Sequence, residues 1–270
     1  MNTIDKLIDL ALEEDIGAGD VTTENLVPPE AGGSGQVVAK EALVLAFERL
    51  DPDIAWQPHR SDGDAVDAGT SVLTVSGKLQ ALLKGERVAL NFLQRLSGVA
   101  TLVRTYTAKI PGGSARLVDT RKTTPGWRAL EKYAVRVGGA GNHRMGLYDG
   151  VLIKDNHIAV CGGVAPAVAR IRDRISHLMK IEIEVATLEQ VREALAAGVE
   201  VIMLDNMEID QIRKAVALID GKAVIEVSGN VTDARLTRLA LAGVDIISVG
   251  ALTHSARCVD LSMRITGTDA

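Results

Sequence analysis

The sequence predicts an α/β fold whose C-terminal part is a parallel β/α barrel. From residue 116 onward, six short apolar runs alternate with helical stretches, a pattern typical of parallel sheets. Polar or ionisable residues gather at the ends of these runs, and in a barrel those ends form the single face that carries the active site. A doubly wound sheet would scatter part of this set around one switch point, so the barrel is favoured. The runs are residues 116–118, 151–153, 180–185, 201–204, 223–227 and 245–249.

Helices are expected after each run, from the spacing of apolar residues and from helix stops such as Gly198 and Gly243. Before the barrel, the spacing predicts helices over 3–15 and from 79 to about 106, with strand-like runs at 35–41 and 72–77. The sequence PGGS at 111–114 predicts a boundary between an N-terminal domain, 1–112, and a barrel domain, 113–265, and a return of the C-terminal tail to the N-terminal domain stays open. The barrel helices are expected at about 127–137, 162–175, 187–198, 207–219, 232–243 and 256–265.

The composition restricts the function classes. The chain has 270 residues and is 47% hydrophobic and 24% charged, as expected for a globular protein of one large or two modest domains. A net charge of −5 argues against non-specific nucleic-acid binding. No apolar run is long enough to span a bilayer, and no signal peptide is recognisable near Met1, so we expect a cytoplasmic protein without a membrane partner.

Several cationic residues follow the first two strands of the predicted barrel. Such charges are costly near a core unless they meet anions, and Arg binds a carboxylate or a phosphate through two parallel hydrogen bonds. The alternative is a solvated face, or ion pairs with Asp119 and Asp149. The pattern favours an anion-binding site made by Arg121, Lys122, His143, Arg144 and Lys154.

Two carboxylates, Glu184 and Asp205, end successive strands and should be neighbours. Such a pair can hold Mg²⁺, partly through water and substrate, or stabilise a developing positive charge. Salt bridges to the cations are the alternative. Glu182 lies one alternation before Glu184 and should point the same way, so the pattern alone does not separate their roles.

Small-residue loops follow the last two strands: Ser228-Gly229-Asn230, and Gly250-Ala251. Loops of this kind offer backbone N–H groups to a phosphate, and barrels often bind phosphate in their last two strand-to-helix loops. Cations, paired carboxylates and a phosphate loop together suit phosphoribosyl transfer to an anionic acceptor.

The segment DTRKTTPGWRALEKYAVRVGGAGNHRMGLYDGVLIKDNHI (119–158) resembles the central signature of quinolinate phosphoribosyltransferases. Other segments are similar to that family in the same order along nearly the whole chain. They are EDIGAGDVTT (14–23), ERVALNFLQRLSGVAT (86–101), EIEVATLEQ (182–190), IMLDN (202–206), EVSGNVT (226–232) and ISVGALTHS (247–255).

The resemblance implies an N-terminal α/β sandwich domain and an open, TIM-like α/β barrel. It implies transfer of phosphoribose from phosphoribosyl pyrophosphate to quinolinate with decarboxylation, which gives nicotinate mononucleotide for NAD biosynthesis, with Mg²⁺ as cofactor. It also implies a homodimer, or a higher oligomer, with shared active sites.

By matching motifs, the resemblance assigns roles to individual residues. Lys154, Glu184 and Asp205 should act at the phosphoribosyl group and its metal, and Arg87 should reach in from the partner subunit. The remaining substrate contacts should come from Thr120, Arg121, Lys122, His143, Arg144, Ser228, Gly229, Asn230, Gly250 and Ala251. Two alternatives stay open: a paralogue of the same fold with another anionic acceptor, and a non-catalytic phosphate-binding barrel.

Overall fold

The computed structural model describes residues 3–37 and 42–269, which form two compact units. The first contains the described residues up to 101 together with 124–137 and the segment from 256 on. The second contains 102–123 and 138–255. The domain limits expected from the sequence, 1–112 and 113–265, remain a prediction.

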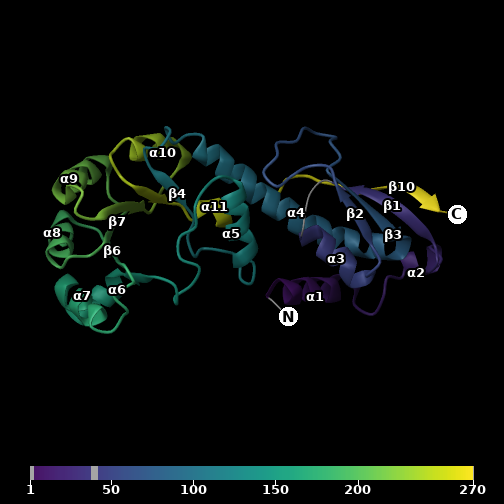
Figure 1. Cartoon of the computed structure of the whole chain (residues 1–270), viewed down its shortest axis with the longest axis horizontal. Helices are drawn as coiled ribbons and strands as arrows, with labels where there is room; N and C mark the ends of the chain where they lie inside the picture. Colours follow the sequence, from purple (N-terminus) through teal and green to yellow (C-terminus); the bar gives the residue numbers. More distant parts are fainter. Residues whose placement is uncertain (1–2, 38–41, 270) are drawn as a thin grey trace. The chain divides into compact units, whose positions relative to one another are not determined.

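The second unit is built on a six-stranded parallel sheet (Figure 1). The order is β4-β9-β8-β7-β6-β5, so five consecutive strands are neighbours and the first strand, β4, pairs with the last, β9. This order is that of a barrel left open between β4 and β5, and it confirms the predicted α/β class. The strands are β4 (Arg116–Val118), β5 (Val151–Ile153), β6 (Ile181–Val185), β7 (Val201–Asp205), β8 (Val224–Ser228) and β9 (Ile246–Ser248).

Helices follow the strands and cover the outer side of the sheet, as α8, α9 and α10 show in Figure 1. Their amphipathic sequences account for this, since α9 buries Ile212, Ala215 and Ile219 on one stripe. The helices of the second unit are α6 (Asp155–Cys161), α7 (Val164–Arg172), α8 (Leu188–Ala196), α9 (Ile209–Ile219), α10 (Asp233–Ala240) and α11 (Ala251–His254).

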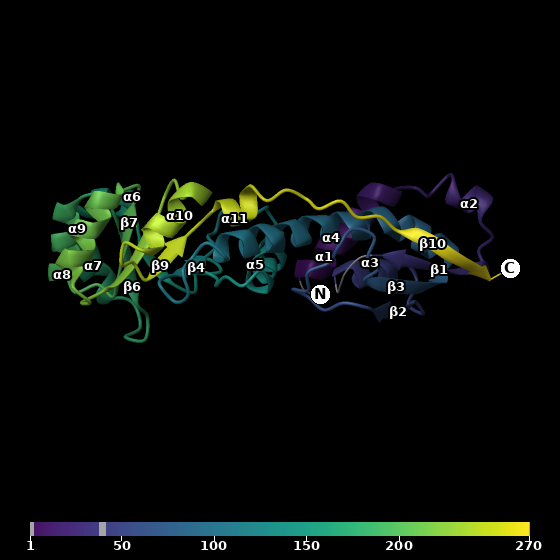
Figure 2. The ribbon, with the colours of Figure 1, turned by 90° about the horizontal axis from the view of Figure 1, so that it is seen from above.

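The first unit contains a four-stranded antiparallel sheet in the order β10-β1-β3-β2 (Figure 2). Its strands are β1 (Gly32–Val37), β2 (Ala55–Pro58), β3 (Leu73–Lys78) and β10 (Arg264–Asp269). Its helices are α1 (Thr3–Ile16), α2 (Thr23–Leu26), α3 (Ala42–Leu50), α5 (Arg128–Val137) and most of α4 (Leu79–Thr107). The last strand of the chain thus belongs to the N-terminal sheet.

The core of the first unit joins these helices to the sheet. Phe47 of α3, Val75 of β3 and Phe92 of α4 are all buried in it, together with Leu130 of α5. The ring of Trp127, just before α5, stacks on Phe92 with 4.3 Å between centroids. These contacts explain why residues 124–137 belong to the first unit, although they lie between β4 and β5 in the sequence.

Two differences from the expected helices lie in the C-terminal half of the chain. The helix expected at 256–265 is wrong: after α11 the chain is extended and then forms β10, because β10 pairs with β1 and tertiary pairing overrides local spacing. The helix expected at 162–175 is observed as α7, and a further helix that the sequence did not predict, α6, precedes it and is separated from it by Gly162 and Gly163 at φ +82° and +139°. The expected strand 35–41 is observed up to Val37, and its remainder lies outside the described residues.

Candidate active site

The strand register places the predicted site residues of the second unit on one face of the sheet. Directly paired residues of parallel strands share a face, as do residues two apart along one strand. Glu184 pairs with Met203, and Asp205, two residues further, pairs with Ser228. On the neighbouring strand, Leu152 pairs with Glu182. The polar residues at these strand ends therefore point to the same side, as a barrel interior requires.

Lys154 and Glu184 form an ion pair at the carboxyl ends of β5 and β6. Lys154 Nζ lies 2.5 Å from Glu184 Oε2, with the two side chains 45% and 16% exposed. The sequence left open whether Glu184 binds a metal or pairs with a cation, and in this structure it pairs with Lys154. Its second oxygen and its access to solvent leave it able to take part in further binding.

The ends of β7 and β8 are linked by side-chain amides. Asn206 donates from Nδ2 to Asp205 Oδ2 at 2.7 Å, and Asn230 donates from Nδ2 to Asn206 Oδ1 at 3.0 Å. Three residues here have left-handed backbone, namely Asn206 (φ 53°), Gly229 (φ 82°) and Asn230 (φ 47°). Non-glycine residues with left-handed backbone are uncommon, although asparagine adopts it more readily than most, and such conformations are concentrated at functional sites. A Cβ at Gly229 would lie 2.2 Å from Asn206 Oδ1, so only glycine fits.

Lys122 lies directly over the turn that begins α11. A Cβ on Gly250 would come within 2.8 Å of Lys122 Cδ, and Thr253 Oγ1 donates to the Lys122 carbonyl at 2.7 Å. These contacts bring a predicted cation next to a predicted phosphate loop. Lys122 itself is exposed, whereas Arg121 and Thr120 beside it are half-buried.

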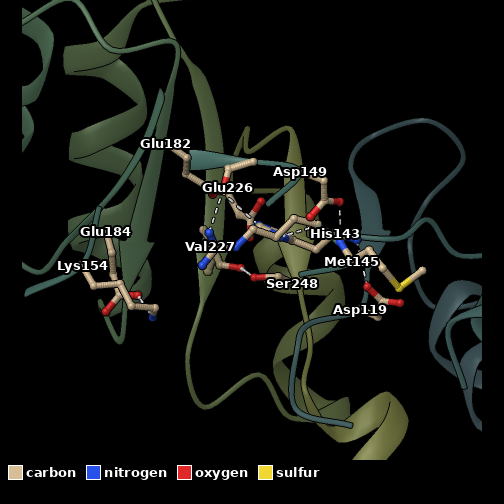
Figure 3. A network of polar contacts seen from close by, with 12 residues as sticks. Asp119, His143, Met145, Asp149, Lys154, Glu182, Glu184, Glu226, Val227 and Ser248 are labelled. Carbon is tan, nitrogen blue, oxygen red and sulfur yellow. Dashed lines mark hydrogen bonds and ion pairs between the residues drawn. The ribbon is translucent and has the colours of Figure 1, made fainter. Parts of the chain in front are cut away.

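Two aspartates hold the segment that carries His143 and Arg144 by accepting hydrogen bonds from its backbone. Asp119, fully buried, accepts from the His143 backbone N–H at 2.8 Å and from Asn142 Nδ2 at 2.7 Å. Asp149 accepts from the backbone N–H groups of Met145 and Gly146. The sequence offered both aspartates as ion-pair partners of the cations, and in the structure both accept hydrogen bonds from the backbone of this segment (Figure 3).

Inside the barrel, His143 meets two buried glutamates from β6 and β8 (Figure 3). Its Nε2 lies 3.1 Å from Glu182 Oε2 and 3.6 Å from Glu226 Oε1. Burial and, after it, the charge of Glu182 raise the pKa of Glu226 to about 7. Glu182 and Glu226 each retain one buried oxygen that makes no hydrogen bond to any described residue.

Arg144 is held close to other charges. Its guanidinium donates to the Gly150 carbonyl at 2.8 Å. Burial, and then the positive charge of Arg121, lower the pKa of Arg144, while Glu182 and Asp149 act in the opposite direction. The two half-buried arginines are close enough for their positive charges to repel each other. Such a site favours an anion with more than one negative charge, which relieves this repulsion.

The sequence missed Glu226 as a site residue. It is an ionisable residue in the middle of a buried strand, and such a charge is costly without a partner, so its position inside the run AVIEV was an available signal. Arg87, by contrast, is exposed on α4 in the first unit, and its predicted role in a partner's site remains a prediction.

Models of a single family match both parts of the chain. "Quinolinate phosphoribosyl transferase, N-terminal domain" matches residues 20–97, and "Quinolinate phosphoribosyl transferase, C-terminal domain" matches residues 99–264. The chain belongs to the quinolinate phosphoribosyltransferase family.

Relatives of this family match nearly the full chain. A protein of Synechocystis sp., named "Probable nicotinate-nucleotide pyrophosphorylase [carboxylating]", is 47% identical over 97% of this chain and 92% of its own length. A Bacillus subtilis protein of the same name is 43% identical over 97% of this chain and 93% of its own length.

Solved structures of the quinolinate phosphoribosyltransferase family have the same fold. The crystal structure of NadC from Streptococcus pyogenes has a TM-score of 0.93 and 40% identity, covering 98% of this chain and 97% of that one. The nicotinate-nucleotide pyrophosphorylase from Francisella tularensis gives a TM-score of 0.91 and 36% identity, covering 98% and 96%. The family resemblance and the fold class predicted from the sequence are both confirmed.

Proposed function

We propose that this member of the quinolinate phosphoribosyltransferase family transfers phosphoribose from phosphoribosyl pyrophosphate to quinolinate with loss of CO₂, giving nicotinate mononucleotide for NAD biosynthesis. The observation that supports this most strongly is the grouping of Arg121, Lys122 and Arg144 beside the small-residue loop at Gly250. A planar diacid can meet the two arginines while the sugar phosphate meets the loop. The alternatives, another anionic acceptor or a silent phosphate-binding barrel, find no support in the relatives.

Binding of the two substrates is divided between the two sides of the site. The quinolinate carboxylates meet Arg121, Lys122 and Arg144, with Thr120 beside them. The 5′-phosphate meets the turn of Ser228, Gly229 and Asn230 and the backbone at Gly250 and Ala251. His143 was expected among the quinolinate contacts from the sequence, and both of its ring nitrogens already bond within the protein.

The donor set at the rim fits Mg²⁺. Glu184 and Asp205 offer carboxylate oxygens from neighbouring strands, and Mg²⁺ prefers such ligands while keeping several waters and substrate phosphates. When bound there, the ion would neutralise charge on the leaving pyrophosphate. Lys154, already 2.5 Å from Glu184, is placed to accompany the same phosphates.

The reaction then needs no protein nucleophile. As pyrophosphate departs, the carboxylates of Glu184 and Asp205 stabilise the positive charge that develops on the sugar. The pyridine nitrogen, oriented by the arginines, attacks C1′. The ring becomes cationic, the bond from C2 to its carboxylate breaks to release CO₂, and the positive ring nitrogen stabilises the electron pair left on C2 until a proton replaces the lost group.

The decisive experiment follows quinolinate loss and CO₂ release with and without phosphoribosyl pyrophosphate and Mg²⁺. CO₂ release that requires quinolinate, phosphoribosyl pyrophosphate and Mg²⁺ supports the proposal, and release without phosphoribosyl pyrophosphate contradicts it. In Arg121→Ala, quinolinate-dependent turnover should collapse while phosphoribosyl pyrophosphate still binds. Unchanged quinolinate kinetics in this variant would contradict the assignment of Arg121 to quinolinate binding.

The remaining expectations are proposals as well. Arg87 on α4 would complete the site of a partner subunit in a homodimer, and sedimentation together with Arg87→Ala kinetics tests this. Among the described residues no helix is both long and apolar enough to cross a bilayer. The cytoplasmic location remains a prediction.

A further inference from the structure

The hydrogen bonds of His143 fix the protonation of its ring. The backbone N–H of Arg144 donates to His143 Nδ1 at 2.8 Å, so Nδ1 is an acceptor and carries no proton. The other nitrogen, Nε2, lies 3.1 Å from a carboxylate oxygen of Glu182, which can only accept from it. The imidazole is therefore neutral, with its single proton on Nε2. It adds no positive charge to the cations around it.

This arrangement argues against a metal ion at the same place. The ligand atoms of His143, Glu182 and Glu226 all lie within 4.8 Å of one another, as in a metal site. However, a histidine that binds a metal through Nε2 donates its Nδ1–H to an acceptor. Here Nδ1 accepts a hydrogen bond from a backbone N–H instead. Nε2 therefore carries the proton and directs it toward the glutamates.

The two glutamates are suited to hold this ring. The side chain of Glu226 is 3% exposed and that of Glu182 is 10% exposed, and they approach Nε2 from β8 and β6. Ser248 Oγ on β9 lies beside them and donates to the Val227 carbonyl. Burial keeps Glu226 protonated toward neutral pH, which limits repulsion between the two carboxyl groups.

We propose that Glu182 and Glu226 are positioning residues for the acceptor diacid. They hold His143 as a neutral imidazole with the proton on Nε2, and the imidazole in turn fixes the backbone that carries Arg144. His143 thus acts through Arg144 and does not contact the diacid through its ring nitrogens. This inference rests on the proposed function of the site for its substrate, but the tautomer it assigns can be measured without any substrate.

The first measurement is ¹⁵N NMR of the full chain with labelled histidine, without substrate, near neutral pH. The His143 signal, identified by its loss in His143→Gln, should be that of a neutral ring protonated on Nε2. In Glu226→Met, which keeps the length but removes both oxygens, the signal should shift toward a mixture of tautomers. A charged ring, or a ring protonated on Nδ1, in the wild type overturns the proposal.

The second measurement is steady-state kinetics for both substrates. Glu226→Met should raise KM for quinolinate about tenfold and leave KM for phosphoribosyl pyrophosphate unchanged, whereas Glu226→Gln, which keeps an acceptor oxygen, should restore quinolinate KM to within about threefold. In a His143→Gln background, Glu226→Met should have little further effect, because both changes act on one chain of contacts.

The outcomes separate this inference from the proposed function. Additive effects of the two variants, or equal changes in both KM values, contradict the positioning role. Absence of quinolinate-dependent CO₂ release in the wild type contradicts the proposed function instead, and the NMR signal of His143 still decides the tautomer.

Discussion

Glu182 and Glu184 lie two residues apart on the same face of β6 and have opposite surroundings. Glu184, at the end of the strand, is partly exposed and pairs with Lys154. Glu182, one alternation deeper, is buried and meets His143 and Glu226. A step of two residues along a strand is roughly 6–7 Å. In this barrel that step separates a rim that can reach substrate from an interior that fixes other residues.

The comparison explains why identical residue types have different energetic roles. A carboxylate at a wet rim can change partners during a reaction, because water screens its charge. A carboxylate in the interior interacts more strongly with its partners, because the local dielectric constant is low. A change in its charge carries a larger free-energy penalty there, because the surroundings cannot reorganise. The predictions below test this division.

The largest expected effect is on turnover, at the rim. Glu184→Gln should lower kcat by about 10²–10³, since it removes a charge that stabilises the transition state. The free energy of unfolding should change by less than about 1 kcal/mol. Steady-state kinetics and urea unfolding check both statements. Glu189→Gln, at an exposed glutamate of α8, is the control and should leave both unchanged. An unaltered kcat in Glu184→Gln contradicts the role of the rim.

The next effect is a pH dependence of stability, in the interior. The pKa of Glu226 is raised from 4.5 to about 7, so the folded protein binds more protons than the unfolded chain between these values. Stability from this group is therefore fully present below about pH 4.5 and is lost as the pH rises to about 7, by about 3 kcal/mol in all at 1.36 kcal/mol per pH unit.

Urea unfolding from about pH 5 to pH 8 measures this slope. Glu226→Gln should flatten it and leave the variant relatively more stable at the alkaline end. Glu208→Gln, at an exposed glutamate, should keep the wild-type slope. Identical slopes in Glu226→Gln and the wild type would show that the ionisation of Glu226 is not coupled to folding.

A smaller effect is expected at the strained turn of the rim. Gly229→Ala places a Cβ at φ 82° and 2.2 Å from Asn206 Oδ1, so it should cost about 2 kcal/mol or more and raise KM for phosphoribosyl pyrophosphate. Gly221→Ala, at φ 71° with no atom within 4 Å of the new Cβ, is the matched control for backbone strain alone. Equal costs for the two variants would show that the contact with Asn206 is relaxed without penalty.

The smallest effect concerns the stability of the rim ion pair. Lys154→Met should change the free energy of unfolding by no more than about 1 kcal/mol, since its side chain is 45% exposed. Thermal or urea unfolding measures this. A loss of several kcal/mol in the free energy of unfolding would show that the Lys154–Glu184 pair stabilises the fold. Glu184 would then not differ from the buried Glu182 in its contribution to stability.

Much of the fold could be predicted because the relevant signals are local. The six apolar runs became β4 to β9, and the polar residues after them share one face, since alternation along a strand depends only on position. The wrong helix at 256–265 shows the limit. Its segment becomes extended and reaches a strand because Arg264 pairs with Gln36, more than 200 residues earlier, and no local pattern reports such a partner.

The site was predicted unevenly for the same reason. Residues at strand ends, such as Asp205 and Ser228, could be selected by position. The different surroundings of Glu182 and Glu184 could not be predicted, because they depend on how far the His143 segment enters the barrel. Contacts of Asp119 and Gly141 beside β4 fix that position. The neutral state of His143 also required a bond to Nδ1 that only the structure shows.

The return of the chain to its first sheet has a practical consequence. The polypeptide changes units four times, near residues 101, 123, 137 and 255, and its final strand completes the edge beside β1. No single cut separates the two units, so limited proteolysis should not release either one intact. An exchange of halves with a relative would need four junctions, and an affinity tag at the C-terminus would be attached to the N-terminal sheet.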